Sequence, residues 1–201
     1  MLEQRIQQQF FESADLHYQA AEVLARPICA AAQALVAGLT AGGRVLVGGL
    51  GPSAALAQLF ATALVGRFER ERPGLAAMVL GSDAVTLAAL AALSAQTRFD
   101  QVLARQVDTL GQPGDLLLLV TCDGELPALT AAAKAAQAKD MTVIALTGRS
   151  AGALGQALGE TDVLLSVPHE RRARTLETQL LVLHCLCDAI DQQLLGEQDS
   201  E

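Results

Sequence analysis

Short apolar runs that are bounded by glycine or aspartate alternate with alanine-rich helical segments along most of this chain. This alternation is typical of a parallel sheet whose consecutive strands are connected by helices. Because the runs contain almost no polar residues, we expect helices to cover both faces of the sheet. Five strands are predicted, at Val45–Val47, Ala76–Leu80, Leu116–Val120, Val143–Leu146 and Val163–Val167.

The segment before the first strand carries apolar residues at helical spacing from residue 2 to about 38. Pro27 predicts a break in it, which would make the segment a helical arm or hairpin. Leu2, Ile6 and Phe10 lie in line on the first part, so we expect that part to pack on its own domain or on a neighbouring subunit. Five further helices are predicted, at residues 53–66, 84–93, 127–138, 151–158 and 171–195.

The chain is therefore predicted to be an α/β protein, a three-layer αβα sandwich with a five-stranded parallel sheet and an N-terminal helical arm. Its 201 residues are 51% hydrophobic and 18% charged, which suits one buried core. We expect one domain over residues 1–201, with the arm at 1–40, the α/β core at 41–170 and a final helix at 171–195.

Charge and cysteine content exclude several classes of protein. The net charge of −8 opposes the approach of nucleic acids and anionic membranes, so we expect neither as a partner. The four cysteines lack CxxC spacing and are expected to be reduced and mostly buried. No signal sequence and no uninterrupted apolar stretch of membrane-spanning length is recognised, so a cytoplasmic protein is predicted.

The loop after the first strand has features of an anion site. Gly49 and Gly51 precede a helix, and Ser53 is predicted to cap that helix, whose N-terminal N–H groups attract anions. The spacing Gly49-x-Gly51-x-x-Ala54 also matches a dinucleotide fingerprint. That match is weak, because a forty-residue arm comes first and the nearest acidic residue at a strand end, Asp83, is over thirty residues away.

A resemblance to a known family follows from several blocks of sequence. These blocks lie at residues 43–46, 49–53, 67–73 (Arg-Phe-Glu-Arg-Glu-Arg-Pro), 110–115, 145–148 and 185–191 (Cys-Leu-Cys-Asp-Ala-Ile-Asp). Together they resemble the phosphoheptose isomerase group of SIS (sugar isomerase) domains, and within it the initiator-associating proteins that bind the replication initiator DnaA. The resemblance covers nearly the whole chain. It implies a five-stranded SIS fold and a homotetramer whose subunits contact one another through the arm and the last helix.

The residues that do the chemistry in the isomerases are replaced in this chain. Isomerisation of a sugar phosphate needs a base and an acid close to the reacting carbons. The positions that match the family's metal-binding histidine and catalytic glutamate are Leu59 and Ala63. In the first loop, Leu50 replaces an asparagine, and Pro52 replaces a glycine and so removes an N–H donor.

The second phosphate loop of the family falls on residues 121–126. Thr121 keeps one hydroxyl and Gly124 is retained, but Asp123 and Glu125 introduce two carboxylates. Like charges near 4 Å oppose binding by about 4 kcal/mol at an effective dielectric constant of 20, so we expect this loop to repel a phosphate dianion.

The final helix retains one of the family's imidazoles. His184 matches a metal-binding histidine, but its partners are absent, so no metal and no other cofactor is predicted. If a ligand still binds, we expect it at Gly49, Gly51, Ser53, Thr121, Gly124 and His184.

Two features of the C-terminal third suggest protein contacts. Arg171, Arg172 and Arg174 form the densest basic cluster, which either clamps an acidic partner or forms local ion pairs. Leu194 and Leu195, at the end of the last helix, are candidate contacts for a protein partner.

The resemblance and these replacements favour a catalytically silent homotetrameric scaffold that binds DnaA. Two alternatives stay open: a phosphoheptose isomerase acting on sedoheptulose 7-phosphate, and a sensor that binds a phosphosugar without reacting.

Overall fold

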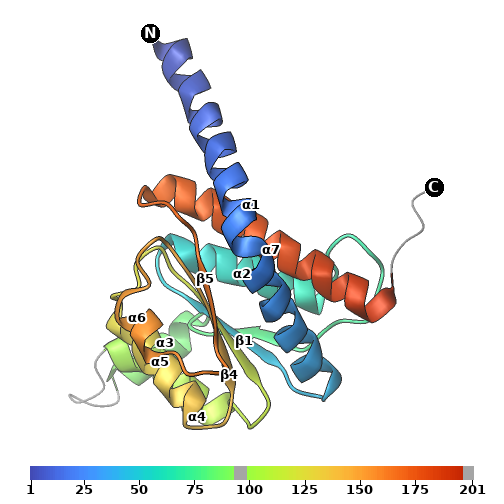
Figure 1. The fold of residues 1–201 in the computed structure, drawn as a ribbon. Helices are drawn as coiled ribbons and strands as arrows, with labels where there is room; N and C mark the ends of the chain where they lie inside the picture. The colour runs from blue at the N-terminus through green and yellow to red at the C-terminus, as the bar shows by residue number, and fades with distance from the viewer. Residues whose placement is uncertain (93–98, 197–201) are drawn as a thin grey trace.

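The computed structural model describes residues 1–92 and 99–196, of which residues 86, 91 and 92 are described by their backbone alone. Its centre is a five-stranded parallel sheet in the order β2-β1-β3-β4-β5 (Figure 1). The strands are β1 (Val45–Gly49), β2 (Ala77–Val79), β3 (Leu116–Val120), β4 (Thr142–Thr147) and β5 (Val163–Ser166). All five predicted strands are confirmed, and so is the covering of the sheet on both faces.

Three long helices cover one face of the sheet: α1 (Leu2–Thr40), α2 (Pro52–Val65) and α7 (Arg172–Leu195). The other face carries α3 (Ala84–Ala92), the 3₁₀ turn η1 (Phe99–Gln101), α4 (Val102–Leu110), α5 (Pro127–Gln137) and α6 (Gly152–Ala157). Alternate residues of each strand pack against the two helix layers, because successive side chains of a strand point to opposite faces. In β3, for example, Leu116 and Leu118 join the core under α1, α2 and α7, whereas Leu117 and Leu119 join the core under α4 and α5.

The predicted break at Pro27 is wrong, because α1 is one continuous helix through that residue. An internal proline removes one backbone hydrogen bond and costs a helix about 3 kcal/mol. Packing on both sides of Pro27 offsets this cost, since Leu24, Ala31 and Leu35 are buried in the core.

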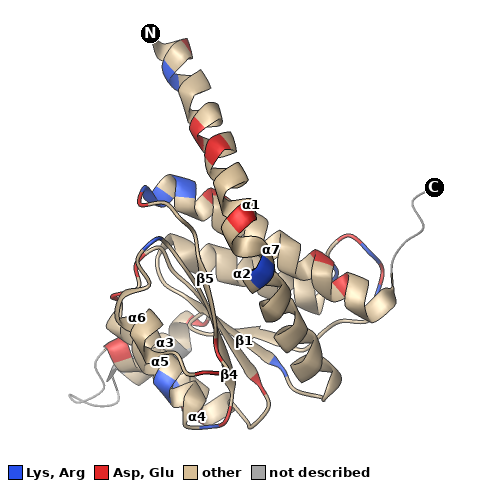
Figure 2. Cartoon of the chain, in the orientation of Figure 1, with Lys and Arg blue, Asp and Glu red and all other residues tan. Residues whose placement is uncertain are grey.

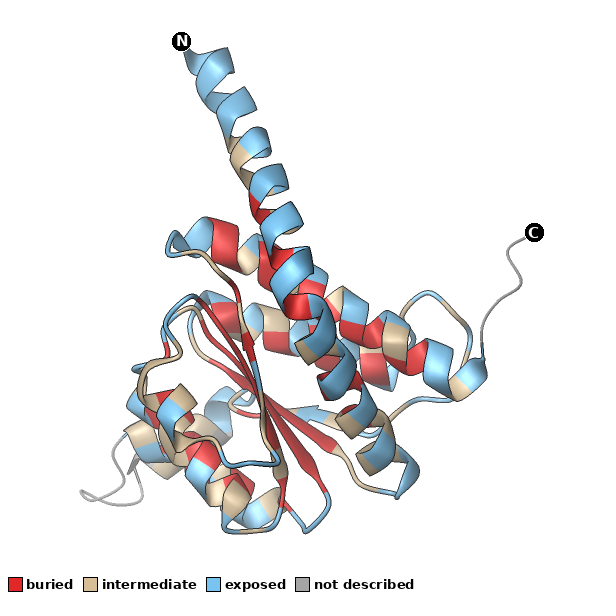
Figure 3. Ribbon diagram, in the orientation of Figure 1, coloured by how far each residue is buried: buried red, intermediate tan, exposed pale blue. Residues whose placement is uncertain are grey.

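The N-terminal end of α1 projects beyond the rest of the molecule (Figures 1 and 3). Three side chains that lie in line there, Leu2, Ile6 and Phe10, are between 50% and 73% exposed in the single chain. Of the two alternatives for this part of the helix, packing on its own domain is therefore wrong.

Further along, α1 is tied to the start of α7 by polar contacts. Ser13 donates to Glu177 at 3.0 Å, Arg171 pairs with Glu12 at 2.8 Å, and Arg174 Nη1 donates to the carbonyl of Gln9. Figure 2 shows acidic positions along α1 and basic positions at the start of α7.

Two smaller expectations also fail. Helix α4 is absent from the predicted helices, although its apolar residues recur on one face, with Val102, Leu103 and Val107 buried. Of the four cysteines, all of which are free, only Cys187 is buried, while Cys29 and Cys185 are exposed and Cys122 is half-buried.

Among the described helices, α1 alone is long and apolar enough to cross a membrane. The window that meets this criterion has a mean hydropathy of 1.5 and is 22% buried. Core helices of soluble proteins have the same property, so it does not by itself indicate a membrane segment.

Candidate functional site

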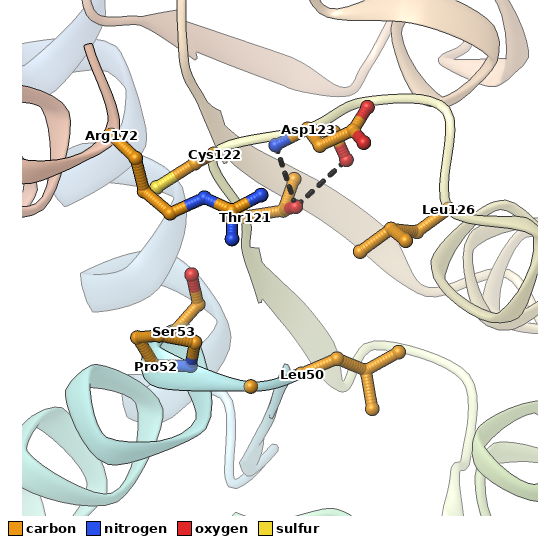
Figure 4. Close-up of a pocket in the computed structure, with 9 residues that line it drawn as sticks. Leu50, Pro52, Ser53, Thr121, Cys122, Asp123, Leu126 and Arg172 are labelled. Atoms are coloured by element: carbon orange, nitrogen blue, oxygen red, sulfur yellow. Dashed lines mark hydrogen bonds between the residues drawn. The ribbon is translucent and has the colours of Figure 1, made fainter.

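The strand order reverses between β1 and β3, and in open α/β sheets ligands bind beyond the carboxyl ends of the strands at such a point. A crevice of about 220 Å³ lies there (Figure 4). It is lined by residues of the loop after β1, the loop after β3 and the first turn of α7: Leu50, Gly51, Pro52, Ser53, Thr121, Cys122, Asp123, Leu126 and Arg172.

The first loop makes a tight connection from β1 to α2. A Cβ on Gly49 would lie 2.6 Å from the backbone oxygen of Ser53, so only glycine lets the strand end pack this closely on the helix. Gly51 precedes the helix with a φ of 59°, a conformation that suits glycine. The predicted cap at Ser53 is wrong, because Gly51 is the N-cap and Ser53 lies inside the first turn, where its side chain is buried.

Most hydrogen bonds of the polar groups in the second loop are made within the loop itself. The Thr121 hydroxyl accepts a hydrogen bond from the Asp123 N–H at 3.0 Å and donates to the Asp123 carbonyl at 2.8 Å. Asp123 Oδ1 in turn accepts the N–H of Glu125 at 3.0 Å. The Glu125 carboxylate lies against Gly152 at the start of α6 and does not line the crevice. Of the two carboxylates that were expected to repel a phosphate, only that of Asp123 therefore lines the crevice.

Arg172 supplies a positive charge that the sequence alone did not place at this crevice. Its guanidinium lies between Ser53 and Thr121, opposite the first loop (Figure 4). Its neighbours Arg171 and Arg174 are paired with Glu12 and Glu177. Within residues 1–92 and 99–196, Arg172 has neither a hydrogen-bond nor an ion-pair partner.

Cys122 lies beside Arg172 on the crevice wall. Burial raises the pKa of its thiol, while a hydrogen bond with Ser53 and the charge of Arg172 oppose that rise. The net direction is upward, so the thiol stays protonated at neutral pH.

Gln179 of α7 stabilises the base of the crevice through hydrogen bonds. Its buried side-chain amide donates to the carbonyl of Thr121 at 2.7 Å and, more weakly, to that of Leu146 at 3.4 Å. Its side-chain oxygen accepts a weak hydrogen bond from the Cys122 thiol at 3.8 Å. Helix α7 thereby fixes the ends of β3 and β4 relative to one another. Gln179 is not among the residues predicted for the site from the sequence.

The structure brings three of the six predicted ligand-binding residues, Gly51, Ser53 and Thr121, to the crevice. Gly49 lies just behind it. Gly124 packs against Ala151, where a Cβ would clash with the backbone oxygen.

The remaining candidates lie elsewhere on α7. The His184 ring packs against Phe68 in a tilted arrangement, with ring centroids 5.4 Å apart, and does not line the crevice. Leu194 packs on the core, and Leu195 is 39% exposed at the end of the helix.

The residues present do not fit the metal ion that the family resemblance implies. Leu59 and Ala63 offer no donor atoms on α2, and His184 is turned toward Phe68. Nowhere in the described ranges do three or more His, Cys, Asp or Glu side chains gather as a metal centre would require.

Comparison with known proteins identifies the family. Residues 9–148 match the SIS domain. A phosphoheptose isomerase from Methylibium petroleiphilum is 57% identical over 99% of this chain and 98% of its own length. A DnaA initiator-associating protein DiaA from Yersinia pseudotuberculosis is 44% identical over 99% of this chain and all of its own length.

A solved structure agrees with these relatives. The phosphoheptose isomerase of Francisella tularensis superposes with a TM-score of 0.90 at 38% identity, covering 96% of this chain and 99% of that one. The fold, the matched domain and these full-length relatives agree, and this chain belongs to the SIS domain family.

Proposed function

We propose that this chain binds the phosphate group of a phosphorylated sugar in the crevice between the loops that follow β1 and β3. The observation that carries the proposal is the guanidinium of Arg172, which has no hydrogen-bond or ion-pair partner among the described residues and faces Ser53 in the first turn of α2. Arginine binds phosphate through charge-assisted hydrogen bonds, each worth about 1.5–3 kcal/mol. This gain offsets the repulsion from the single carboxylate of Asp123. The names of two relatives, both phosphoheptose isomerases, support a sugar phosphate as the class of ligand.

We further propose that the single chain holds this ligand without isomerising it. Moving a proton between adjacent carbons needs a base near the reacting atoms. The described crevice offers two titratable groups besides Arg172, namely Cys122 and Asp123. The Cys122 thiol is kept protonated by burial, and the Asp123 carboxylate is hydrogen-bonded to its own loop.

Calorimetry with sedoheptulose 7-phosphate tests the binding proposal. We expect Arg172→Gln to weaken binding at least tenfold, because it removes the cation from the crevice. Arg149→Gln is the matched control, since Arg149 is an exposed arginine 3.5 Å from Glu170 on a neighbouring loop. Equal affinity of the wild-type protein and the Arg172 variant, or no binding of any sugar phosphate, would overturn the proposal.

A second candidate function is phosphoheptose isomerase activity. It is favoured by the relatives of that name at 57% and 48% identity. It requires a base from outside the described crevice, such as a side chain of another copy of the chain. A coupled assay with sedoheptulose 7-phosphate, with and without zinc, tests it: turnover that exceeds an inert protein control and is lost in Arg172→Gln supports the enzyme.

A third candidate is a homotetrameric scaffold for DnaA in the cytoplasm. The DiaA relative at 44% identity favours it, and the half-exposed Leu195 at the end of α7 is a candidate contact. A pull-down with purified DnaA at micromolar concentration tests this role, with Leu195→Ser as the variant and Leu181→Ser as the control. No association of the wild-type protein would count against the scaffold.

A further inference from the structure

The first turn of α7 carries the arginine that lines the crevice and two arginines that contact α1. Arg172 lines the crevice. Arg171 pairs with Glu12 at 2.8 Å, and Arg174 Nη1 donates to the carbonyl of Gln9. The three arginines lie within four consecutive residues, so they belong to one turn of the helix. A movement of this turn relative to α1 therefore also moves Arg172.

The contacts between the two helices form a polar clamp, which consists of Gln9, Glu12 and Ser13 on α1 and Arg171, Arg174 and Glu177 on α7. Glu177 joins its parts, because Oε1 accepts from Arg174 Nη2 at 2.5 Å and Oε2 accepts from the Ser13 hydroxyl at 3.0 Å. Arg174 is only 7% exposed, and a charge buried this far is tolerated when it has partners. The clamp thus fixes the first turn of α7 against α1.

The clamp lies outside the apolar core that the two helices share. Leu16 is the first buried residue of α1, and Val182 is the first buried apolar residue of α7. The N-cap residue Arg171 makes no side-chain cap, although its N–H donates to Nδ1 of His169 at 2.9 Å. Polar contacts, more than apolar packing, therefore set the position of the turn that carries Arg172.

We propose that Glu12 and Ser13 are positioning residues for the binding of phosphate by Arg172. This inference rests on the proposed function and adds α1 to the elements that build the site. Neither residue lines the crevice, and they act through Arg171 and Glu177. Charge-assisted hydrogen bonds depend on direction as well as distance, so a displaced turn weakens phosphate binding even though the charge of Arg172 is retained.

The sign of the effect distinguishes positioning from simple electrostatics. Glu12→Gln removes a negative charge, which by electrostatics alone would tighten the binding of an anion. Positioning predicts the opposite, and we expect calorimetry with sedoheptulose 7-phosphate to show at least fivefold weaker binding. Ser13→Ala changes no charge and is expected to weaken binding at least threefold. Glu22→Gln, at an exposed glutamate of the same helix, is the matched control and should bind like the wild-type protein.

Exchange of the two charged groups tests for rescue. Glu12→Arg places two arginines against each other and is expected to weaken binding at least tenfold. The double variant Glu12→Arg with Arg171→Glu restores an ion pair of reversed polarity, and we expect its affinity to return to within threefold of the wild-type value. Electrostatics alone predicts the reverse order, because the double variant has less positive charge beside the crevice than Glu12→Arg.

These variants are expected to fold. The side chains of Arg171 and Glu12 are 49% and 38% exposed, and exposed ion pairs contribute little to stability. Far-ultraviolet circular dichroism gives the temperature at which each variant unfolds. A merely structural role of the clamp would lower this temperature and leave the affinity of the folded protein unchanged, which would contradict the proposal.

The outcomes separate this inference from the proposed function. Unchanged or tighter binding in Glu12→Gln, together with weaker binding in Arg172→Gln, would overturn the positioning role and leave the phosphate site standing. Equal affinity of the wild-type protein and Arg172→Gln would overturn both.

Discussion

The Nε atom of Arg72 lies 2.5 Å from Oδ1 of Asp191, and the two side chains are only 1% and 2% exposed. The same guanidinium donates to the carbonyls of Leu64 and Ala63, each at 2.8 Å. Arg72 thus fastens the segment between α2 and β2 to both α2 and α7. A charge that is buried this completely is tolerated only when it is paired.

We expect Asp191→Ala to lower the free energy of unfolding by about 3 kcal/mol, since breaking a buried ion pair leaves one charge uncompensated. We expect a loss of stability near the low end of the usual range, because Arg72 keeps its hydrogen bonds to two backbone carbonyls. Urea denaturation measures it. Arg67→Gln, which removes the exposed pair of Arg67 with Glu71, is the control and should change stability by less than about 1 kcal/mol. Equal losses in the two variants would contradict this account of the buried pair.

Gly124 shows how a residue assigned to a ligand can have a packing role. A Cβ added there would clash with the backbone oxygen of Ala151, and no side-chain movement relieves that contact. We expect Gly124→Ala to destabilise the protein by about 1–3 kcal/mol, a typical loss for overpacking a tight contact. Gly159→Ala is the matched control, because its nearest contacts, at 3.5 and 3.8 Å, are ordinary. Thermal unfolding compares them, and a Gly124 variant as stable as the control would remove the packing explanation.

The strands were predictable because a buried parallel strand needs a nearly uninterrupted apolar run, and each of the five runs is bounded by glycine or a polar residue. Pro27 misled the prediction because tertiary packing of Leu24 and Leu35 outweighs a local helix penalty. Helix α4 could have been found, since Val102, Leu103 and Val107 recur at helical spacing.

The role of Arg172 could not be predicted, because three arginines near one helix start point in different directions. Successive residues of a helix are about 100° apart, and only the folded chain decides which side chain meets which neighbour. Arg171 reaches Glu12, Arg174 reaches Glu177 and Gln9, and Arg172 reaches the crevice. The loop glycines, in contrast, were found from their position after β1.

Cys187 makes stability depend on pH in the alkaline range. Burial raises the pKa of its thiol to about 12, with the charge of Asp191 acting in the same direction. Above pH 9 the unfolded chain releases this proton while the folded chain keeps it. The contribution of the protonated thiol to the free energy of unfolding is therefore fully present below about pH 9 and is lost as the pH rises toward 12. The loss is at most about 1.4 kcal/mol per pH unit.

Urea denaturation at pH 8, 9.5 and 10.5 measures this dependence. Cys187→Ala should lose less stability over the interval than the wild-type protein, whatever its stability at pH 8. If the free energy of unfolding falls equally with pH in the two proteins, Cys187 does not contribute to the pH dependence of stability.

The exposed stripe on α1 gives the last prediction. Leu2, Ile6 and Phe10 follow one another at intervals of four residues, so they share one face of the helix. Apolar side chains in such a row favour contact with another protein surface over contact with water. We predict that this stripe holds copies of the chain together, in a homotetramer of four times 20.9 kDa.

Light scattering after size exclusion measures the mass. A double change of Ile6→Asp and Phe10→Asp should shift the protein to smaller assemblies, because a charge buried in an apolar contact costs several kcal/mol. Val85→Asp, at a 78% exposed position on the opposite layer, is the control and should leave the mass unchanged. Since Ile6 and Phe10 contribute little to the core of their own chain, the double variant should keep the wild-type helix content. A tetramer that survives both substitutions would assign the assembly to another surface, and a wild-type monomer would rule the assembly out.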